Sequence, residues 1–370
     1  MNIKRFSLSA AFLSVLFFIS TTPASADEFT MMAVGDILPH PSWQSIELPI
    51  SKLLDGAMTT LFGADLVVGN LETPLTDKAE PTANKNKDSI RVGREFVFKA
   101  ESPGVAQGLK DAGFAVLTLA NNHMLDYREA GLRDTLARLK AAGIATAGAG
   151  LDFEGAVRPC TVKVKGMEVV FLSASDVVPK DYEATPTRPG IASMKDDNAF
   201  MERVKATRKA NPKALLVLCL HWGVEASFSP TGRQKELAHA FIDAGADLII
   251  GHHPHRMQGV ELYKGKPIFY SLGNFQFDCK SPGDETFIAK VTYKGGSPVP
   301  VDVAVMPVHI ADGGYPSVLK KDEPEYAAIK KKLDGMCRGL GSCVEGEEVK
   351  VLPPPPVLAM PDGESDIEGI

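Results

Sequence analysis

Residues 247–255, DLIIGHHPH, combine a short apolar run with three of the chain's eight histidines. The run is continuously apolar, which is typical of a strand that is covered on both faces. Five further segments also have an apolar run that ends in polar residues: FTMMAVGDI (29–37), ADLVVGNLE (64–72), FAVLTLANNH (114–123), EVVFLSASD (168–176) and ALLVLCLHWG (214–223). We therefore predict six buried strands that each end in polar residues.

Helical patterns lie between these predicted strands. In EAGLRDTLARLKAAGI (129–144), Leu132, Leu136 and Leu139 form one apolar stripe, and Gly143 is placed to end the helix. Similar patterns are DNAFMERVKATRKANP (197–212) and TGRQKELAHAFIDAGA (231–246). Strands that alternate with helices predict an α/β fold.

Composition limits the class of protein. The chain has 370 residues and is 44% hydrophobic, so it can bury a substantial core. Its formal net charge of -6 argues against general nucleic-acid binding and leaves only a local basic patch open.

The first 26 residues have the pattern of a signal peptide. Lys4 and Arg5 precede an apolar run at 10–19, and Ala24 and Ala26 form a small-x-small cleavage site. The run is shorter than the roughly 20 apolar residues that a membrane span needs. We predict a mature chain that starts near Asp27 and is secreted or periplasmic, with cell-surface or membrane association left open.

The ends of the predicted strands carry carboxylates, carboxamides and imidazoles. In α/β folds such groups gather in the crevice at the carboxyl ends of the strands. Hydrolytic metal sites combine hard oxygen ligands with imidazoles, so the convergence predicts a metal site. Each residue also has a structural alternative, such as a turn role for Asp36 or a hydrogen-bonded core role for His221. The prediction rests on joint occurrence: Asp36, Asn70, Glu72, Asn122, His123, His221, His252, His253 and His255.

Several motifs together resemble one known family. VGDIL, GNLETPLT, FVFKA, LTLANNHMLDY, HWGVE and GHHPHRMQGVELYKGKPIFYSLGNFQFD follow one another between about Thr30 and Asp278. This series is similar to the CapA-like family of poly-gamma-glutamate capsule synthesis, within the calcineurin-like metallophosphoesterase superfamily. The resemblance implies a metallophosphatase-like sandwich of two mixed β-sheets flanked by helices.

The resemblance also implies roles for individual residues. His123 would protonate the leaving oxygen, with Asp126 orienting its ring, and His252 would stand where the superfamily often has glycine. His40 is a weak substitute for the histidine of the superfamily's first motif. The implied metal ligands are Asp36, Glu72 as the carboxylate between two metals, Asn122, His221, His253 and His255.

Two departures from the superfamily pattern affect the expected metal content. The superfamily's first motif has a histidine two residues after its aspartate, whereas this chain has Leu38, which cannot coordinate a metal. Glu72 replaces the usual aspartate with a longer carboxylate. We therefore expect one or two divalent ions, and manganese, iron and zinc all suit this mixed nitrogen and oxygen set.

The resemblance implies an anionic polymer or a phosphoester as substrate and membrane-bound polymer synthase components as partners, while the net charge argues against nucleic acid. Two functional classes stay open: a metal-dependent hydrolase of the phosphoesterase type, and a non-catalytic polymer-binding or scaffold component. Residues 81–100 form a long polar loop that could be a lid, a substrate rim or a surface excursion. Cations near the motifs could bind an anion or lie in solvent: Arg91, Arg94, Lys99 and Arg256.

The chain changes character towards its C-terminus. Residues 285–310 alternate like two strands joined by a Gly-Gly turn and are expected to complete the second sheet. We place the main domain at 27–312 and a helical extension with a Pro-rich, disordered tail at 313–370. Cys337 and Cys343 could form a disulfide or stay as two thiols.

Overall fold

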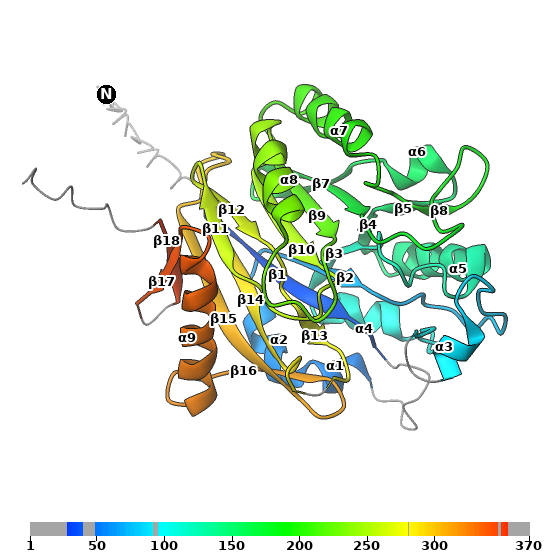
Figure 1. The fold of residues 1–370 in the computed structure, drawn as a ribbon, viewed down its shortest axis with the longest axis horizontal. Coiled ribbons are helices and arrows are strands. Elements are labelled where there is room, and N and C mark those ends of the chain that lie inside the picture. The colour runs from blue at the N-terminus through cyan, green and yellow to red at the C-terminus, as the bar shows by residue number, and fades with distance from the viewer. Residues whose placement is uncertain (1–27, 40–48, 92–94, 280, 347–348, 354–370) are drawn as a thin grey trace, which may run out of the picture.

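The structure is a computed structural model that describes residues 28–39, 49–91, 95–279, 281–346 and 349–353. The predicted signal peptide, His40, Arg94 and the tail from residue 354 lie outside the described residues. Two mixed β-sheets face one another and carry helices on their outer faces (Figure 1). The predicted α/β sandwich is confirmed.

The larger sheet has ten strands among the described residues, in the order β17-β18-β15-β14-β1-β2-β3-β4, with β13 beside β1 and β16 beside β15. Strands β1, β2, β3 and β4 run parallel. Their bounds, in chain order, are β1 Glu28–Ile37, β2 Leu66–Leu71, β3 Phe114–Thr118, β4 Ala145–Ala147, β13 Asn274–Gln276, β14 Glu285–Lys294, β15 Asp302–Ala311, β16 Tyr315–Val318, β17 Cys343–Glu345 and β18 Lys350–Leu352.

The second sheet has six described strands in the order β11-β12-β10-β9-β7-β6, of which β7, β9, β10 and β12 run parallel. Strands β5 (Ala149–Gly150) and β8 (Gly190–Ile191) form a small separate pair. The bounds in the second sheet are β6 Cys160–Val164, β7 Met167–Ser175, β9 Leu215–His221, β10 Leu248–His252, β11 Val260–Tyr263 and β12 Lys266–Phe269.

The continuous apolar runs follow from the layered arrangement. In β1, Met31 and Ala33 join the core between the two sheets, whereas Met32 and Val34 join the core under the helices of the larger sheet. In β9, Val217 likewise lies in the core between the sheets. Because both faces of each central strand are covered, neither face can be polar.

Helices cover the outer face of each sheet. Buried residues of α1 (Ile50–Leu53), α2 (Asp55–Leu61), α4 (Val105–Asp111) and α5 (Arg128–Ala141) belong to the outer core of the larger sheet. Helices α7 (Asp197–Ala210) and α8 (Gly232–Asp243) cover the second sheet. The described chain also has two short helices, α3 (Lys87–Arg91) and α6 (Phe153–Ala156).

The predicted stripe on α5 is confirmed. Leu132 and Leu139 are buried, and Leu136 is partly buried against the same core. The helix ends at Ala141, and Gly143 follows with a φ of 72°, a conformation that glycine adopts without strain. Local sequence therefore determines the end of this helix.

The C-terminal part of the chain contributes to the larger sheet. The predicted hairpin at 285–310 is present as β14 and β15, but it pairs beside β1 and so extends the sheet that begins the chain, not the second sheet. Helix α9 (Pro324–Arg338) buries Ile329 and Leu333 in the core between the sheets. Strands β16, β17 and β18 continue the sheet to Leu352. All five cysteines are free thiols, including Cys337 and Cys343.

Candidate metal centre

The carboxyl ends of strands from both sheets meet at one place. Asp36, near the end of β1, is in register with Asn70 of β2 and Asn274 of β13. In the second sheet, His221 at the end of β9 is in register with His252 at the end of β10. The two edges approach each other, since His252 Nε2 lies 3.3 Å from the carbonyl oxygen of Val34 in β1. His252 therefore bonds the backbone of the other sheet.

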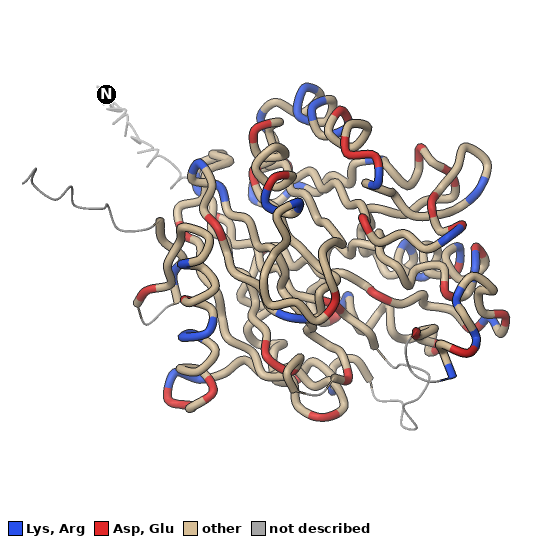
Figure 2. Tube along the Cα trace, in the orientation of Figure 1, with Lys and Arg blue, Asp and Glu red and all other residues tan. Residues whose placement is uncertain are grey.

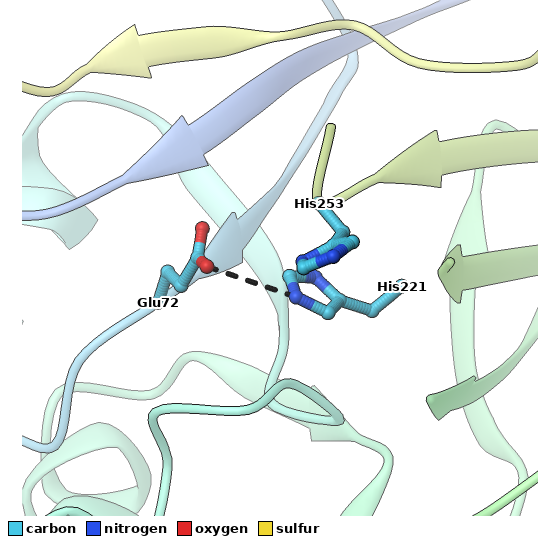
Figure 3. Close-up of side chains that lie close together, drawn as sticks. All are labelled: Glu72, His221 and His253. Carbon is cyan, nitrogen blue, oxygen red and sulfur yellow. Dashed lines mark ion pairs between the residues drawn. The ribbon is translucent and has the colours of Figure 1, made fainter. Parts of the chain in front are cut away.

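Glu72 lies at the middle of this convergence. It follows β2 directly, is fully buried, and neither of its carboxylate oxygens has a hydrogen-bond partner. Its Oε1 is 3.7 Å from His221 Nε2 and 3.7 Å from His255 Nε2. Figure 3 shows Glu72 facing His221, with the ring of His253 beside that of His221. Burial, and then the charge of Asp36, raise the pKa of Glu72 well above its usual value.

Two groups of potential ligands share Glu72. The first consists of Glu72, His221 and His253, and the second of Asp36, Glu72 and His255, with ligand atoms within 4.8 Å of one another in each group. Asn122 adjoins the first group, because its Oδ1 lies 2.8 Å from His221 Nε2. All six predicted ligands are thus brought together, in two sets that meet at one carboxylate.

The histidines of the first group are neutral near neutral pH, which is the form that binds a metal. Burial lowers the pKa of His253 to about 3 and that of His221 well below its usual value, with neighbouring histidines adding to the effect. A metal binds the neutral imidazole, so no proton has to be displaced near neutral pH. The turn after β10 holds His253 and His255 at φ values of 97° and 53°. Such strained backbone is typical of functional sites.

The residues present fit a divalent cation. Four buried side-chain atoms of the first group have no hydrogen-bond partner: both oxygens of Glu72, Nδ1 of His221 and Nδ1 of His253. Buried polar groups are almost always paired, so carboxylate oxygens without a hydrogen-bond partner fit a bound cation. Leu38 is fully buried, so a ligand at that position is replaced by an apolar side chain.

A second buried cluster adjoins the metal ligands. His123 Nδ1 lies 2.7 Å from Asp126 Oδ2, and the imidazole stacks on Phe98 at a ring-centroid distance of 4.2 Å. Asp126 also accepts hydrogen bonds from Phe98 N, Tyr182 Oη and Lys85 Nζ, at 2.7, 2.8 and 2.5 Å. Asp126 therefore fixes the ring of His123, as the resemblance implied.

The two members of this pair shift in the same direction. Burial lowers the pKa of His123 to about 4, with Asp126 opposing and Lys85 adding to the shift. Burial alone would raise the pKa of Asp126, but the neighbouring His123 and Lys85 outweigh it and lower this pKa. Without bound ligands the pair is therefore a neutral imidazole beside a carboxylate.

Sequence reasoning missed three residues at the site. Lys85 and Tyr182 contact Asp126, and Glu225 lies near His253 and His255. All three come from loops, and the only signals were the polar loop at 81–100 for Lys85 and the HWGVE motif for Glu225.

The cations that the sequence did name have other partners. Arg91 pairs with Asp88 at the surface, and Lys99 pairs with Glu101. Arg256 donates to the carbonyl oxygen of His255, next to the ligands. The contacts of Arg91 match the surface alternative, whereas the side chain of Lys99 is only 12% exposed and also lies over the Tyr127 ring.

Fold and site together define an α/β sandwich of two mixed sheets with a candidate metal centre where the edges of the sheets meet. The chain belongs to the family described as "Bacterial capsule synthesis protein PGA_cap", which matches residues 30–279. It is 36% identical over 257 residues to "Capsule biosynthesis protein CapA" of Bacillus anthracis, covering 68% of this chain and 60% of that protein. It is 34% identical over 280 residues to "PGA biosynthesis protein CapA" of Bacillus subtilis (strain 168), covering 73% of this chain and 68% of that protein.

Proposed function

We propose that this protein is a metal-dependent hydrolase of the phosphoesterase type that acts in the synthesis or export of a capsule polymer such as poly-gamma-glutamate. Family membership and the names of the two relatives support the process. One observation carries the chemistry: a buried carboxylate with no hydrogen-bond partner, Glu72, is shared by two groups of ligands beside the His123–Asp126 pair.

The chain's own residues would divide the work as follows. Asp36, Glu72, Asn122, His221, His253 and His255 would hold one or two divalent ions. Such ions, when bound, polarise a phosphoryl oxygen and lower the pKa of water. Asp126 holds His123 at Nδ1, which leaves Nε2 as the atom that would carry a proton to the leaving oxygen. The carboxylate of Asp126 would stabilise the protonated ring.

A non-catalytic role is the second candidate. Leu38 occupies the position at which the superfamily has a metal-binding histidine, and a centre that lacks this ligand could bind an anionic polymer without cleaving it. The hydrolase is favoured because a scaffold has no physical need for an oriented histidine–aspartate pair beside the ligands.

The proposal includes export from the cytoplasm, on the evidence of the signal-peptide pattern at 1–26. Among the described residues, no helix has the length and apolar character that crossing a membrane requires. The proposed substrate is an anionic polymer or a phosphoester, and membrane-bound polymer synthase components are the proposed partners. Acidic and basic residues are interspersed along the described chain (Figure 2), which gives no support to nucleic-acid binding.

Activity assays on the full chain test the proposal. Protein loaded with manganese or zinc would be assayed on p-nitrophenyl phosphate, bis-p-nitrophenyl phosphate and poly-gamma-glutamate. We expect turnover of at least one, and a loss of about 10²- to 10⁴-fold in His123→Ala with metal content retained. His239→Ala is the matched control, since His239 bonds Glu261 and stacks on Tyr263. Unchanged turnover in His123→Ala would remove its acid role, and bound metal without any turnover would favour the scaffold.

A further inference from the structure

We propose that Glu225 is a further ligand of the metal centre and supplies the coordination that Leu38 does not. This inference rests on the metal centre of the proposed function. Neither the superfamily pattern nor the sequence reasoning assigned a role to Glu225, which lies four residues after His221 in a loop.

Glu225 lies within reach of both ligand groups. One of its carboxylate oxygens groups with ring nitrogens of His253 and His255, all within 4.8 Å of one another. His253 belongs to the first ligand group and His255 to the second. A carboxylate at this point would therefore add a ligand beside a histidine of each group.

An unpaired atom supports a ligand here. His253 is 4% exposed, and its Nδ1 has no hydrogen-bond partner. Asp36 and Glu72 are fully buried, whereas Glu225 is exposed. Glu225 would thus add a ligand at the solvent-exposed part of the centre. Its charge already reaches the centre, because it contributes to raising the pKa of Glu72.

The loop that carries Glu225 is fastened to the turn that carries the histidines. Ala226 N donates to the carbonyl oxygen of Pro254 at 2.8 Å, between His253 and His255 in sequence. The side-chain amide of Gln258 donates to the carbonyl oxygen of Ser227 at 3.0 Å. Both bonds involve the residues directly after Glu225, one reaching the histidine turn and the other Gln258 just beyond it, so tertiary contacts hold this loop in place.

Two residues with positive φ values flank Glu225 in this loop. Gly223 has a φ of 94° and packs against Gln234 so closely that a Cβ would lie 2.8 Å from its amide. Ala226 has a φ of 59°, which is strained for a residue with a side chain. Positive φ values thus lie on both sides of Glu225, and only the one at Ala226 is strained.

In this proposal, Glu225 compensates for the metal-binding histidine that Leu38 replaces in the first motif. The group of Asp36, Glu72 and His255 has three ligands where the superfamily pattern would provide a histidine as well. Glu225 groups with His255 of this set, so its carboxylate would add a fourth protein ligand from a different loop. It also adds a negative charge, which favours a harder cation than an imidazole would.

The test compares metal binding in Glu225→Gln, Glu225→Asp and wild type. Titration calorimetry of the metal-free full chain with Mn²⁺, followed by elemental analysis after dialysis, gives affinity and stoichiometry without any activity assay. Glu236→Gln is the matched control, because Glu236 is an exposed glutamate in the next helix and its variant has the same change in charge. We expect Glu225→Gln to bind one ion at least about tenfold more weakly or to lose it, with partial recovery in Glu225→Asp.

The outcomes separate this inference from the proposed function. Wild-type binding with affinity in Glu225→Gln within about twofold of wild type would overturn the inference and leave the metal centre intact. A raised KM in Glu225→Gln with unchanged metal affinity would also overturn it, because Glu225 would then contact substrate. No metal in the wild type, even after reconstitution, would overturn the inference and the proposed metal centre together.

Discussion

Two carboxylates in this site are equally buried but differ in their hydrogen-bond partners and in the direction of their pKa shifts. Asp126 and Glu72 both have no solvent exposure. Asp126 accepts from four donors, namely Phe98 N, Lys85 Nζ, Tyr182 Oη and His123 Nδ1, whereas Glu72 accepts from none. Their pKa values shift in opposite directions, down for Asp126 because His123 and Lys85 outweigh burial, and up for Glu72 because of burial and Asp36.

The difference distinguishes a carboxylate that stabilises the fold from one that is available to bind a ligand. A buried charge without a partner destabilises a fold, so an unpaired carboxylate indicates either a protonated acid or an external cation. Neutral imidazoles around Glu72 favour the cation, because each has one ring nitrogen with a lone pair that a metal can bind. Asp126 instead orients one histidine and anchors two loops.

Removing Asp126 tests the role of the carboxylate that has hydrogen-bond partners, and it should have the largest effect on stability. Asp126→Ala leaves Lys85 buried without its counter-ion, so we expect the free energy of unfolding to fall by about 3–5 kcal/mol in chemical denaturation. The double variant Asp126→Ala, Lys85→Met should recover part of this loss. A loss below about 1 kcal/mol would show that the four hydrogen bonds contribute little.

Acid should destabilise the metal-free protein through its buried histidines. The pKa values of His253 and His123 are lowered to about 3 and about 4, and that of His221 is also lowered. Below about pH 6.5 the unfolded chain therefore takes up protons that the folded chain does not. The free energy of unfolding should fall as pH drops from 7 towards 4, by up to about 1.4 kcal/mol per pH unit for each histidine.

Thermal unfolding across this pH range is the measurement. Glu72 acts in the opposite sense, because its raised pKa makes its contribution to stability largest below pH 4.5 and lost as pH rises. The histidines outnumber it, so the net trend should follow them. A melting temperature that is constant between pH 7 and 5 would contradict the assignment of these histidines as neutral and buried.

Glu72→Gln tests the role of the carboxylate that has no hydrogen-bond partner. In metal-free protein at pH 8, burial disfavours the charged form of Glu72, which has no hydrogen-bond partner. The substitution removes this unfavourable burial, so we expect the free energy of unfolding to rise by about 1 kcal/mol. The same variant should lose metal binding, since Glu72 belongs to both ligand groups. A loss of stability comparable to that of Asp126→Ala would mean that Glu72 serves the fold and not a cation.

Lys85→Met should destabilise the fold less than Asp126→Ala does, because Asp126 keeps its three other donors, and its main readout is the titration of His123. The charge of Lys85 lowers the pKa of His123, so its removal should raise this pKa from about 4 in the metal-free protein. An NMR titration of the imidazole resonances measures the change. Lys180→Met is the control, since no shift in the described site is attributed to Lys180. An unchanged titration of His123 would show that Lys85 acts through position and not through charge.

The ligands could be predicted from the sequence because they follow strands. Asp36, Glu72, Asn122, His221 and the histidines after β10 each lie at or just beyond the end of an apolar run, and parallel strands bring such ends to one edge. The order of the strands was not needed for this prediction.

Other features depend on tertiary contacts that no local pattern records. Lys85, Tyr182 and Glu225 reach the site through loops whose paths are fixed by distant partners, such as Pro254 for the loop of Glu225. The hairpin β14–β15 has a clear strand pattern, but only pairing with β1 decides which sheet it extends. Strands β17 and β18 have three residues each, too short for a periodic signal.

Elemental analysis of the folded full chain tests the central claim most directly, with wild type compared to the His253→Ala, His255→Ala double variant after reconstitution with manganese, iron or zinc. The account predicts one or two ions per wild-type chain and almost none in the variant, because each ligand group then loses a histidine. Equal metal in both proteins, or none in either, would contradict the claim that Glu72 and its histidines form a metal centre.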